Sequence, residues 1–400
     1  FGAFRGSVEL LGVTLPSSLT EIKTGAFDNC ARIAEVINKS DLNIVAGSPD
    51  HGGVALAAEG VHSGETRLKT VGDYVFYDGG DEVYLVAYIG KDTVITLPES
   101  YEGRSYIVRE NAFCTTDDIT DITIPGSVEK IERGALYFCN SLINLTLPFV
   151  GETKLSSAAE ADDTMTLKHV FAYTGENGQT EYNIPDTLRK ITVSDGYLQK
   201  GAFKNLSKVK EIVLPDNLET ISEDLFSGCI NLTSLVIPDK VAEIGKNAFF
   251  CCFKLETINI PSSVKKLDTD AFKISALGNY GLIQVDITDV SAWLSISFAN
   301  AAANPLHHAG RLYVNGQLFE ELEITELQNK IPDYAFYNAT CLKSVTIRFG
   351  NVQIGENSFI GCTSISDIDI DSKYLPTVVG DRVANLETVV LSGSTPLAAN

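Results

Sequence analysis

The sequence lacks long apolar runs and carries few basic residues. No stretch reaches the roughly 18 consecutive apolar residues that a membrane-spanning helix needs, so we expect no membrane insertion. Lys and Arg total 31 against 52 Asp and Glu, and the net charge of −21 would repel nucleic-acid phosphates. With 32 Gly, 13 Pro and 8 Cys in 400 residues, collagen-like, disordered and disulfide-scaffold classes are excluded as well. Because 44% of the residues are hydrophobic, the composition predicts an acidic protein with an ordered core.

A phrase of 23 residues recurs along the chain. It begins with a Leu-x-x-Ile-x-Ile-Pro segment, continues with Val-x-x-Ile, and ends with a small residue, Phe and then Cys three positions later. Its prolines at 215, 238 and 261 are 23 residues apart, and the small-Phe pairs starting at 202, 225, 248 and 271 keep the same step. Further pairs at that spacing start at 3 and 26 and at 335 and 358. Internal repeats of this length predict a solenoid.

The physical properties of the phrase support this prediction. The Ile-x-Ile step has period two, so both isoleucines face one side of a short strand. Proline ends that strand because it cannot donate to the ladder. One such unit has a single apolar face and cannot bury it alone, so neighbouring units must stack to close a continuous core.

The phrase resembles the BspA-like leucine-rich repeat family of bacterial surface proteins, and the resemblance covers nearly the whole chain. It implies a right-handed, β-dominated coil with a parallel sheet of short strands, an irregular or 3-10 opposite side and hairpin insertions. It also implies a non-enzymatic, monomeric protein that is secreted or held at the bacterial cell surface. Its function would be adhesion to a protein partner, with host extracellular-matrix or plasma proteins as ligands.

The organisation follows from where the register breaks. We expect one solenoid over residues 1–400, and both ends interrupt a repeat, which predicts a longer natural protein. The chain starts at Phe1, so any signal peptide would already be missing. Turn residues predict hairpins at Asp78–Asp81 and Val314–Gln317 and loops at 47–53 and 62–65. The insertions are expected near 41–66, 77–96, 150–166 and 276–316.

The sequence offers little catalytic or metal-binding chemistry. The five histidines lack tight metal-ligand spacing, and we expect His307 and His308 on an extended surface loop. Asp367 to Asp371 lacks the Gly and Glu that a calcium loop requires. No nucleophile elbow or phosphate loop is present. We therefore predict no catalytic residues, no metal and no cofactor.

The cysteines follow the repeat. Five of them occupy one slot, three residues after the template Phe or Leu, where a small thiol would pack in the coil as a free, buried group. These slot cysteines are Cys30, Cys139, Cys229, Cys252 and Cys362.

Binding is expected on the outward positions beside the first strand isoleucine, which we call the stripe. Its residues are small and polar, rich in Thr, and acidic toward the C-terminus. One interpretation is a flat contact surface for a protein, and the other is that Thr simply suits a solvated strand. The predicted stripe residues are Asp121, Thr123, Asn144, Thr146, Glu211, Ser234, Thr257, Asn259, Ser344, Thr346, Asp367 and Asp369.

Two alternative functions stay open at this point. A carbohydrate-binding or hydrolytic module could be built on the insertions, particularly around Trp293, Phe298 and Tyr313. Trp293 could stack on a sugar there, but we favour a packed core role for it. A structural spacer could instead display another module.

Overall fold

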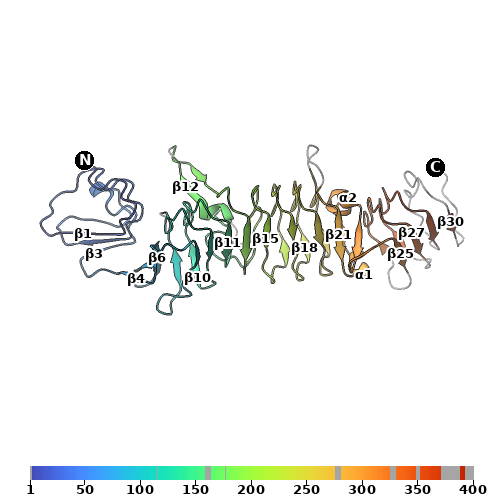
Figure 1. The fold of residues 1–400 in the computed structure, drawn as a ribbon, viewed down its shortest axis with the longest axis horizontal. Coiled ribbons are helices and arrows are strands. Elements are labelled where there is room, and N and C mark those ends of the chain that lie inside the picture. Colours follow the sequence, from blue (N-terminus) through green and yellow to red (C-terminus); the bar gives the residue numbers. More distant parts are fainter. Residues whose placement is uncertain are drawn as a thin grey trace. The chain divides into compact units, whose positions relative to one another are not determined.

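The computed structural model describes residues 2–114, 116–157, 164–175, 177–274, 281–324, 330–347, 352–370 and 388–391. Residues 1–194 and 195–400 form two compact units, and each is described by itself. Both units are built of short strands stacked one after another, as the coils of a β-solenoid (Figure 1). The repeat-solenoid prediction is therefore confirmed. The prediction that one solenoid spans residues 1–400 stays a prediction.

The first unit contains two parallel sheets and one mixed sheet, in which β10, β8 and β6 pair in parallel and β6, β5 and β4 pair antiparallel. A three-stranded parallel sheet comprises β1 (Gly12–Leu15), β2 (Glu35–Asn38) and β3 (Gly60–His62). A second parallel sheet has the order β7 (Val94–Thr96), β9 (Asp121–Thr123), β11 (Asn144–Leu147) and β14 (Lys190–Val193). The third has the order β10 (Val128–Ile131), β8 (Tyr106–Val108), β6 (Val83–Tyr88), β5 (Tyr74–Asp78) and β4 (Leu68–Val71). A separate hairpin pairs β12 (Ala172–Thr174) with β13 (Thr180–Tyr182) after the 3-10 helix η3 (Leu167–Phe171).

The second unit continues the 23-residue repeat in three places. One sheet runs β15 (Glu211–Val213), β17 (Ser234–Leu235), β19 (Thr257–Asn259), β21 (Gln284–Ile287), β23 (Leu312–Val314) and β24 (Gln317–Leu318). A second runs β16 (Thr220–Ile221), β18 (Glu243–Ile244), β20 (Lys266–Leu267) and β22 (Ser297–Phe298). A third runs β25 (Glu321–Ile324), β27 (Ser344–Ile347), β29 (Asp367–Ile370) and β30 (Thr388–Leu391), and β26 (Lys330–Ile331) pairs with β28 (Gln353–Ile354). The helical elements are α1 (Val290–Trp293), η4 (Ala301–Ala303) and α2 (Leu306–Ala309).

A ladder of phenylalanine rings forms the core opposite the strands. In the second unit, the rings of Phe203, Phe226, Phe249 and Phe272 stack at centroid distances of 5.8, 5.2 and 4.8 Å. Their planes are inclined by 7, 25 and 7°, and each ring is buried. The one-coil step of the repeat therefore places identical rings face over face.

The residue before each small-Phe pair adopts the left-handed backbone conformation. Gly25, Gly201, Asn247 and Asp270 have φ between 53 and 76°, and Gly, Asn and Asp tolerate this region best. Tyr334 has the same backbone conformation, with φ of 62°, but departs from the residue preference because its side chain is bulky. The left-handed turn before each ring thus explains why Gly, Asn or Asp usually precedes the small-Phe pair, a preference that hydrophobic spacing alone does not reveal.

The five slot cysteines are buried, as predicted, and all eight cysteines are free. The thiol of Cys229 donates a hydrogen bond to the Phe203 carbonyl at 3.1 Å, and Cys252 donates to Phe226 at 3.3 Å. Cys362 repeats the contact with Phe336 at 3.1 Å. The slot therefore selects a small side chain that can satisfy a buried carbonyl of the preceding coil.

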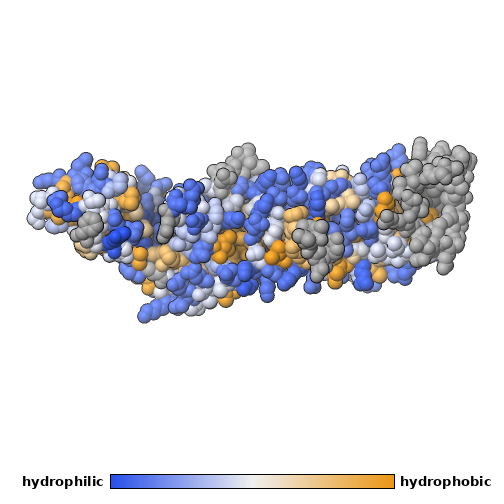
Figure 2. All heavy atoms as spheres, turned by 90° about the horizontal axis from the view of Figure 1, so that it is seen from above, coloured by the Kyte–Doolittle hydropathy of each residue, from blue (hydrophilic) through white to orange (hydrophobic). Residues whose placement is uncertain are grey.

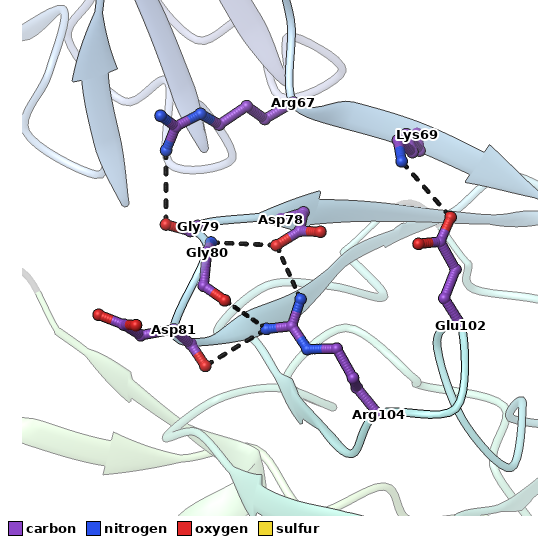
Figure 3. A network of polar contacts seen from close by, with 8 residues as sticks. All are labelled: Arg67, Lys69, Asp78, Gly79, Gly80, Asp81, Glu102 and Arg104. Carbon is purple, nitrogen blue, oxygen red and sulfur yellow. Dashed lines mark hydrogen bonds and ion pairs between the residues drawn. The ribbon is translucent and has the colours of Figure 1, made fainter.

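The hairpin predicted at Asp78–Asp81 connects β5 to β6, and a guanidinium holds its turn (Figure 3). Arg104 donates to the Asp78 carboxylate at 3.0 Å and to the Gly80 carbonyl at 2.6 Å. The same Asp78 carboxylate accepts the Gly80 backbone N–H at 3.0 Å. Together with the ion pair to Arg104, this bond lowers the pKa of Asp78 against the opposing effect of burial. The hairpin predicted at Val314–Gln317 is also present, as the turn between β23 and β24.

A buried arginine links the three-stranded sheet to the mixed sheet. Arg109 is 4% exposed, and its Nε donates to the Glu59 carboxylate at 2.6 Å. The same guanidinium donates to the carbonyls of Arg32 at 3.3 Å and Ile33 at 3.4 Å. Since a buried charge is costly without partners, this set of acceptors fixes the position of the side chain.

The structure corrects several local predictions. The prediction that His307 and His308 lie on an extended surface loop is wrong. Both residues belong to α2 and are half-buried, and their ring centroids are 4.5 Å apart. The predicted loop at 47–53 ends in the 3-10 helix η1 (His51–Gly53). The first residue of the predicted loop at 62–65, His62, belongs to β3, which pairs in parallel with β2. The hairpin of β12 and β13 was not predicted, because its alternation spans only three residues on each strand.

Candidate interaction surface

In the first unit, the stripe is formed by strands β7, β9, β11 and β14, which pair in register. Its second position holds four aligned threonines, Thr96, Thr123, Thr146 and Thr192. At the first position, Asn144 donates through Nδ2 to the Asp121 carboxylate on the neighbouring strand at 2.6 Å. The intervening Ile122, Leu145 and Ile191 are buried, so alternation turns the polar residues outward.

In the second unit, the stripe continues on β15, β17, β19 and β21. Glu211, Ser234, Thr257 and Gln284 are aligned at its first position. Its second position includes two exposed valines, Val213 at 38% and Val236 at 76%. Val236 is therefore largely outside the core, and Val213 is partly covered.

A separate part of the stripe lies on β25, β27 and β29. Glu321, Ser344 and Asp367 are aligned there, as are Glu323, Thr346 and Asp369. Asp367 is exposed, while Ile368 between the two aspartates is buried, in agreement with a solvated face rather than a calcium loop. Asp371 lies outside the described residues.

The structure therefore places all twelve predicted stripe residues on strands, with none of them buried, and those on β27 and β29 belong to a different sheet from those on β15, β17 and β19. That they bind a ligand stays a prediction. Sequence analysis missed further members, although their strands show the same apolar alternation. The additional members are Val94, Thr96, Lys190, Thr192, Gln284, Asp286, Glu321 and Glu323.

The structure gives Trp293 the packed core role and not the sugar-stacking one. The Trp293 side chain is 1% exposed, and its indole N–H donates to the Ala335 carbonyl at 3.0 Å. Phe298 packs against it at a centroid distance of 5.2 Å and is also buried. Both rings belong to the core of this insertion and leave no face for a ligand.

Other kinds of site find little support in the part of the chain that the structure describes. An apolar cavity of about 550 Å³ lies beside β1, lined by residues such as Phe4, Val13 and Phe27. Its only ionisable lining residues, Glu21 and Lys23, pair with each other at 2.6 Å. Among the described residues, no three His, Cys, Asp or Glu side chains cluster as a metal site would require.

Figure 2 shows one face on which blue residues predominate and small orange groups lie between them. In the described ranges, no helix combines the length and apolar character needed to cross a bilayer.

Comparisons with known proteins agree with this architecture. The profile of the BspA type leucine rich repeat region matches in six copies, over residues 1–48, 93–161, 196–295 and 312–391. No curated protein sequence matches the chain.

Solved structures with a similar fold come from bacterial leucine-rich repeat proteins. A leucine rich cell surface protein from Faecalibacterium prausnitzii is 20% identical, with 81% of this chain and 82% of that chain covered and a TM-score of 0.31. A leucine-rich repeat protein from Bacteroides ovatus is 19% identical, with coverages of 80% and 81% and a TM-score of 0.35. An internalin from Listeria monocytogenes is 12% identical, with coverages of 76% and 88% and a TM-score of 0.28.

Proposed function

The chain belongs to the BspA-type leucine-rich repeat family, and on this basis we propose that it is a non-enzymatic protein that binds a protein partner through the stripe. Leucine-rich repeat coils are a general protein-interaction fold, and this family occurs on bacterial surface proteins. The single observation that carries the proposal is the outward stripe, where aligned polar side chains surround the exposed Val213 and Val236. An apolar patch within a polar rim is the usual arrangement of a protein-binding surface.

The finer proposal is adhesion. The protein would be secreted or held at the bacterial cell surface as a monomer, and its ligand would be a host extracellular-matrix or plasma protein. The acidic balance of −21 favours a partner with a basic contact surface, because charge complementarity speeds association and rejects acidic competitors.

The test is surface plasmon resonance of the full chain over a panel of purified extracellular-matrix and plasma proteins. Two variants place bulky charge on the stripe, one with Thr123→Arg and Thr146→Arg and one with Val236→Arg and Thr257→Arg. We expect at least one of them to weaken a detected interaction by about tenfold or more, as loss of an interface anchor does.

Thr220→Arg is the matched control, because Thr220 is a half-buried strand threonine on β16, outside the stripe. Unchanged affinity in both stripe variants would exclude the stripe as the binding face. If no panel protein binds the wild-type chain, the adhesion proposal fails and a structural spacer becomes the favoured function.

A further inference from the structure

The hairpin of β12 and β13 carries an aromatic cluster that the core does not need. Figure 1 shows this hairpin extending beyond the strands of its own unit. The rings of Tyr137 and Tyr173 stack at 4.5 Å with an inclination of 26°, and Phe138 packs edge-on against Tyr137 at 4.3 Å. Phe138 is 36% exposed, and neither tyrosine is buried.

The repeat itself does not call for these rings. In this coil, Leu136 fills the buried position that Phe occupies elsewhere. The two following positions are both aromatic here, Tyr137 and Phe138. Other coils have Lys204 and Asn205 or Ser227 and Gly228, or a single aromatic residue at the first position, as at Phe250 and Tyr337. The second aromatic residue, Phe138, thus stands where several other coils have Asn or Gly, and exposing it costs free energy.

A row of planar polar side chains lies next to the rings. Asn183 donates through Nδ2 to the Asn140 amide oxygen at 3.0 Å and to the Tyr137 carbonyl at 3.4 Å. Asn140 in turn donates to the Asp117 carboxylate at 3.0 Å. Asp117 and Asn140 are exposed, and a carboxylate and a primary amide have more donor and acceptor sites than this row uses.

From this juxtaposition we propose a glycan-binding site on Phe138, Tyr173, Asn140 and Asp117, with a neutral oligosaccharide as its ligand. The apolar face of a pyranose ring packs on an aromatic ring, while its neighbouring hydroxyls exchange hydrogen bonds with amides and carboxylates. Such a combination of aromatic surface and a few placed polar groups is the usual composition of small-molecule sites. The carboxylates of Asp117 and Glu181 and the net charge of −21 disfavour sialylated or sulfated glycans.

Only one face of the hairpin belongs to the proposed site. The Tyr173 hydroxyl donates to the Glu181 carboxylate across the hairpin, and this bond raises the pKa of Tyr173. Tyr182 lies one position further along β13, so its side chain projects from the opposite face of the hairpin. It is 50% exposed, and the Lys168 ammonium lies 5.7 Å from its ring centroid. Tyr182 is therefore a matched control outside the site.

Isothermal titration of the full chain with cellohexaose, chitohexaose and a heparin hexasaccharide tests the proposal. We expect a neutral hexasaccharide to bind and heparin not to bind. Phe138→Ala and Asn140→Ala should each weaken that binding by about tenfold, whereas Tyr182→Ala should leave it within about twofold. Thermal unfolding followed by circular dichroism checks that the variants fold, and Phe138→Leu replaces the alanine variant if it does not.

Three results would overturn the proposal. The first is that neither neutral hexasaccharide binds. The second is that heparin binds instead of them. The third is that Tyr182→Ala loses as much affinity as Phe138→Ala, or that both variants bind as the wild type does.

Discussion

Removing one ring from the phenylalanine ladder tests the physical basis of the coil. Phe249 is 2% exposed and lies between Phe226 at 5.2 Å and Phe272 at 4.8 Å. Burying its side chain contributes roughly 1.5–3 kcal/mol. Each stacked pair adds about 0.5–1.5 kcal/mol. Phe249→Ala should therefore lower the free energy of unfolding by about 3–5 kcal/mol, the usual range for a buried Phe.

The assay is chemical denaturation followed by circular dichroism, together with native-state hydrogen exchange. Because each coil contacts only its neighbours, lost protection should centre on the coils of Phe226 to Phe272. Backbone amides of residues 2–194 should keep their protection and serve as an internal reference. Phe249→Leu keeps most of the apolar volume but loses both ring pairs, so it should be destabilised by less than Phe249→Ala.

The control is Val236→Ala, because Val236 is 76% exposed and its loss should cost less than about 0.5 kcal/mol. A loss below about 1 kcal/mol for Phe249→Ala would refute the packed ladder. Equal loss of exchange protection at residues far from the ladder would refute the nearest-neighbour argument.

Three further predictions follow from backbone strain, a buried charge and the buried thiols. Tyr334→Asn should raise the free energy of unfolding by about 1 kcal/mol, since Asn tolerates the φ of 62° better. Thermal denaturation measures this, and an unchanged or lower midpoint would show that the backbone at Tyr334 is not strained. Arg109→Met should cost about 3–5 kcal/mol by leaving Glu59 and buried carbonyls without their donor, and a neutral result in urea titration would contradict this. Burial raises the pKa of Cys229 to about 12, so the native fold keeps this proton above pH 9 while the unfolded chain loses it. Stability should therefore fall between about pH 9 and 12, and the slot cysteines should resist iodoacetamide at pH 8 until the chain is denatured, which mass spectrometry measures.

The local sequence pattern was sufficient to predict the buried face of the strands in the regular coils. The Ile-x-Ile alternation correctly predicted which face of β9, β11 and β19 is buried, because side-chain direction in a strand depends only on position. The Asp78–Asp81 turn was predicted for the same reason, since turn chemistry lies within four residues. His307 and His308 were predicted wrongly because nothing local shows that α2 packs against the coil, where burial lowers the pKa of His308 to about 4.

The sequence by itself determined the repeat, the coil, the buried ring and thiol slots and the outward side of each strand. All of these depend on spacing, and a fixed spacing of 23 residues brings equivalent side chains together without further information. Which strands share a sheet, and which carbonyl the Trp293 indole binds, became known only from the three-dimensional structure. The tertiary structure also decided that Asn183 meets Asn140 and that the rings of Tyr137 and Tyr173 stack. Asn183 and Tyr173 follow an insertion of irregular length, and no periodicity specifies where such a segment returns to the coil. Asp117 and Asn140, in contrast, are one 23-residue period apart, so the repeat itself brings them together.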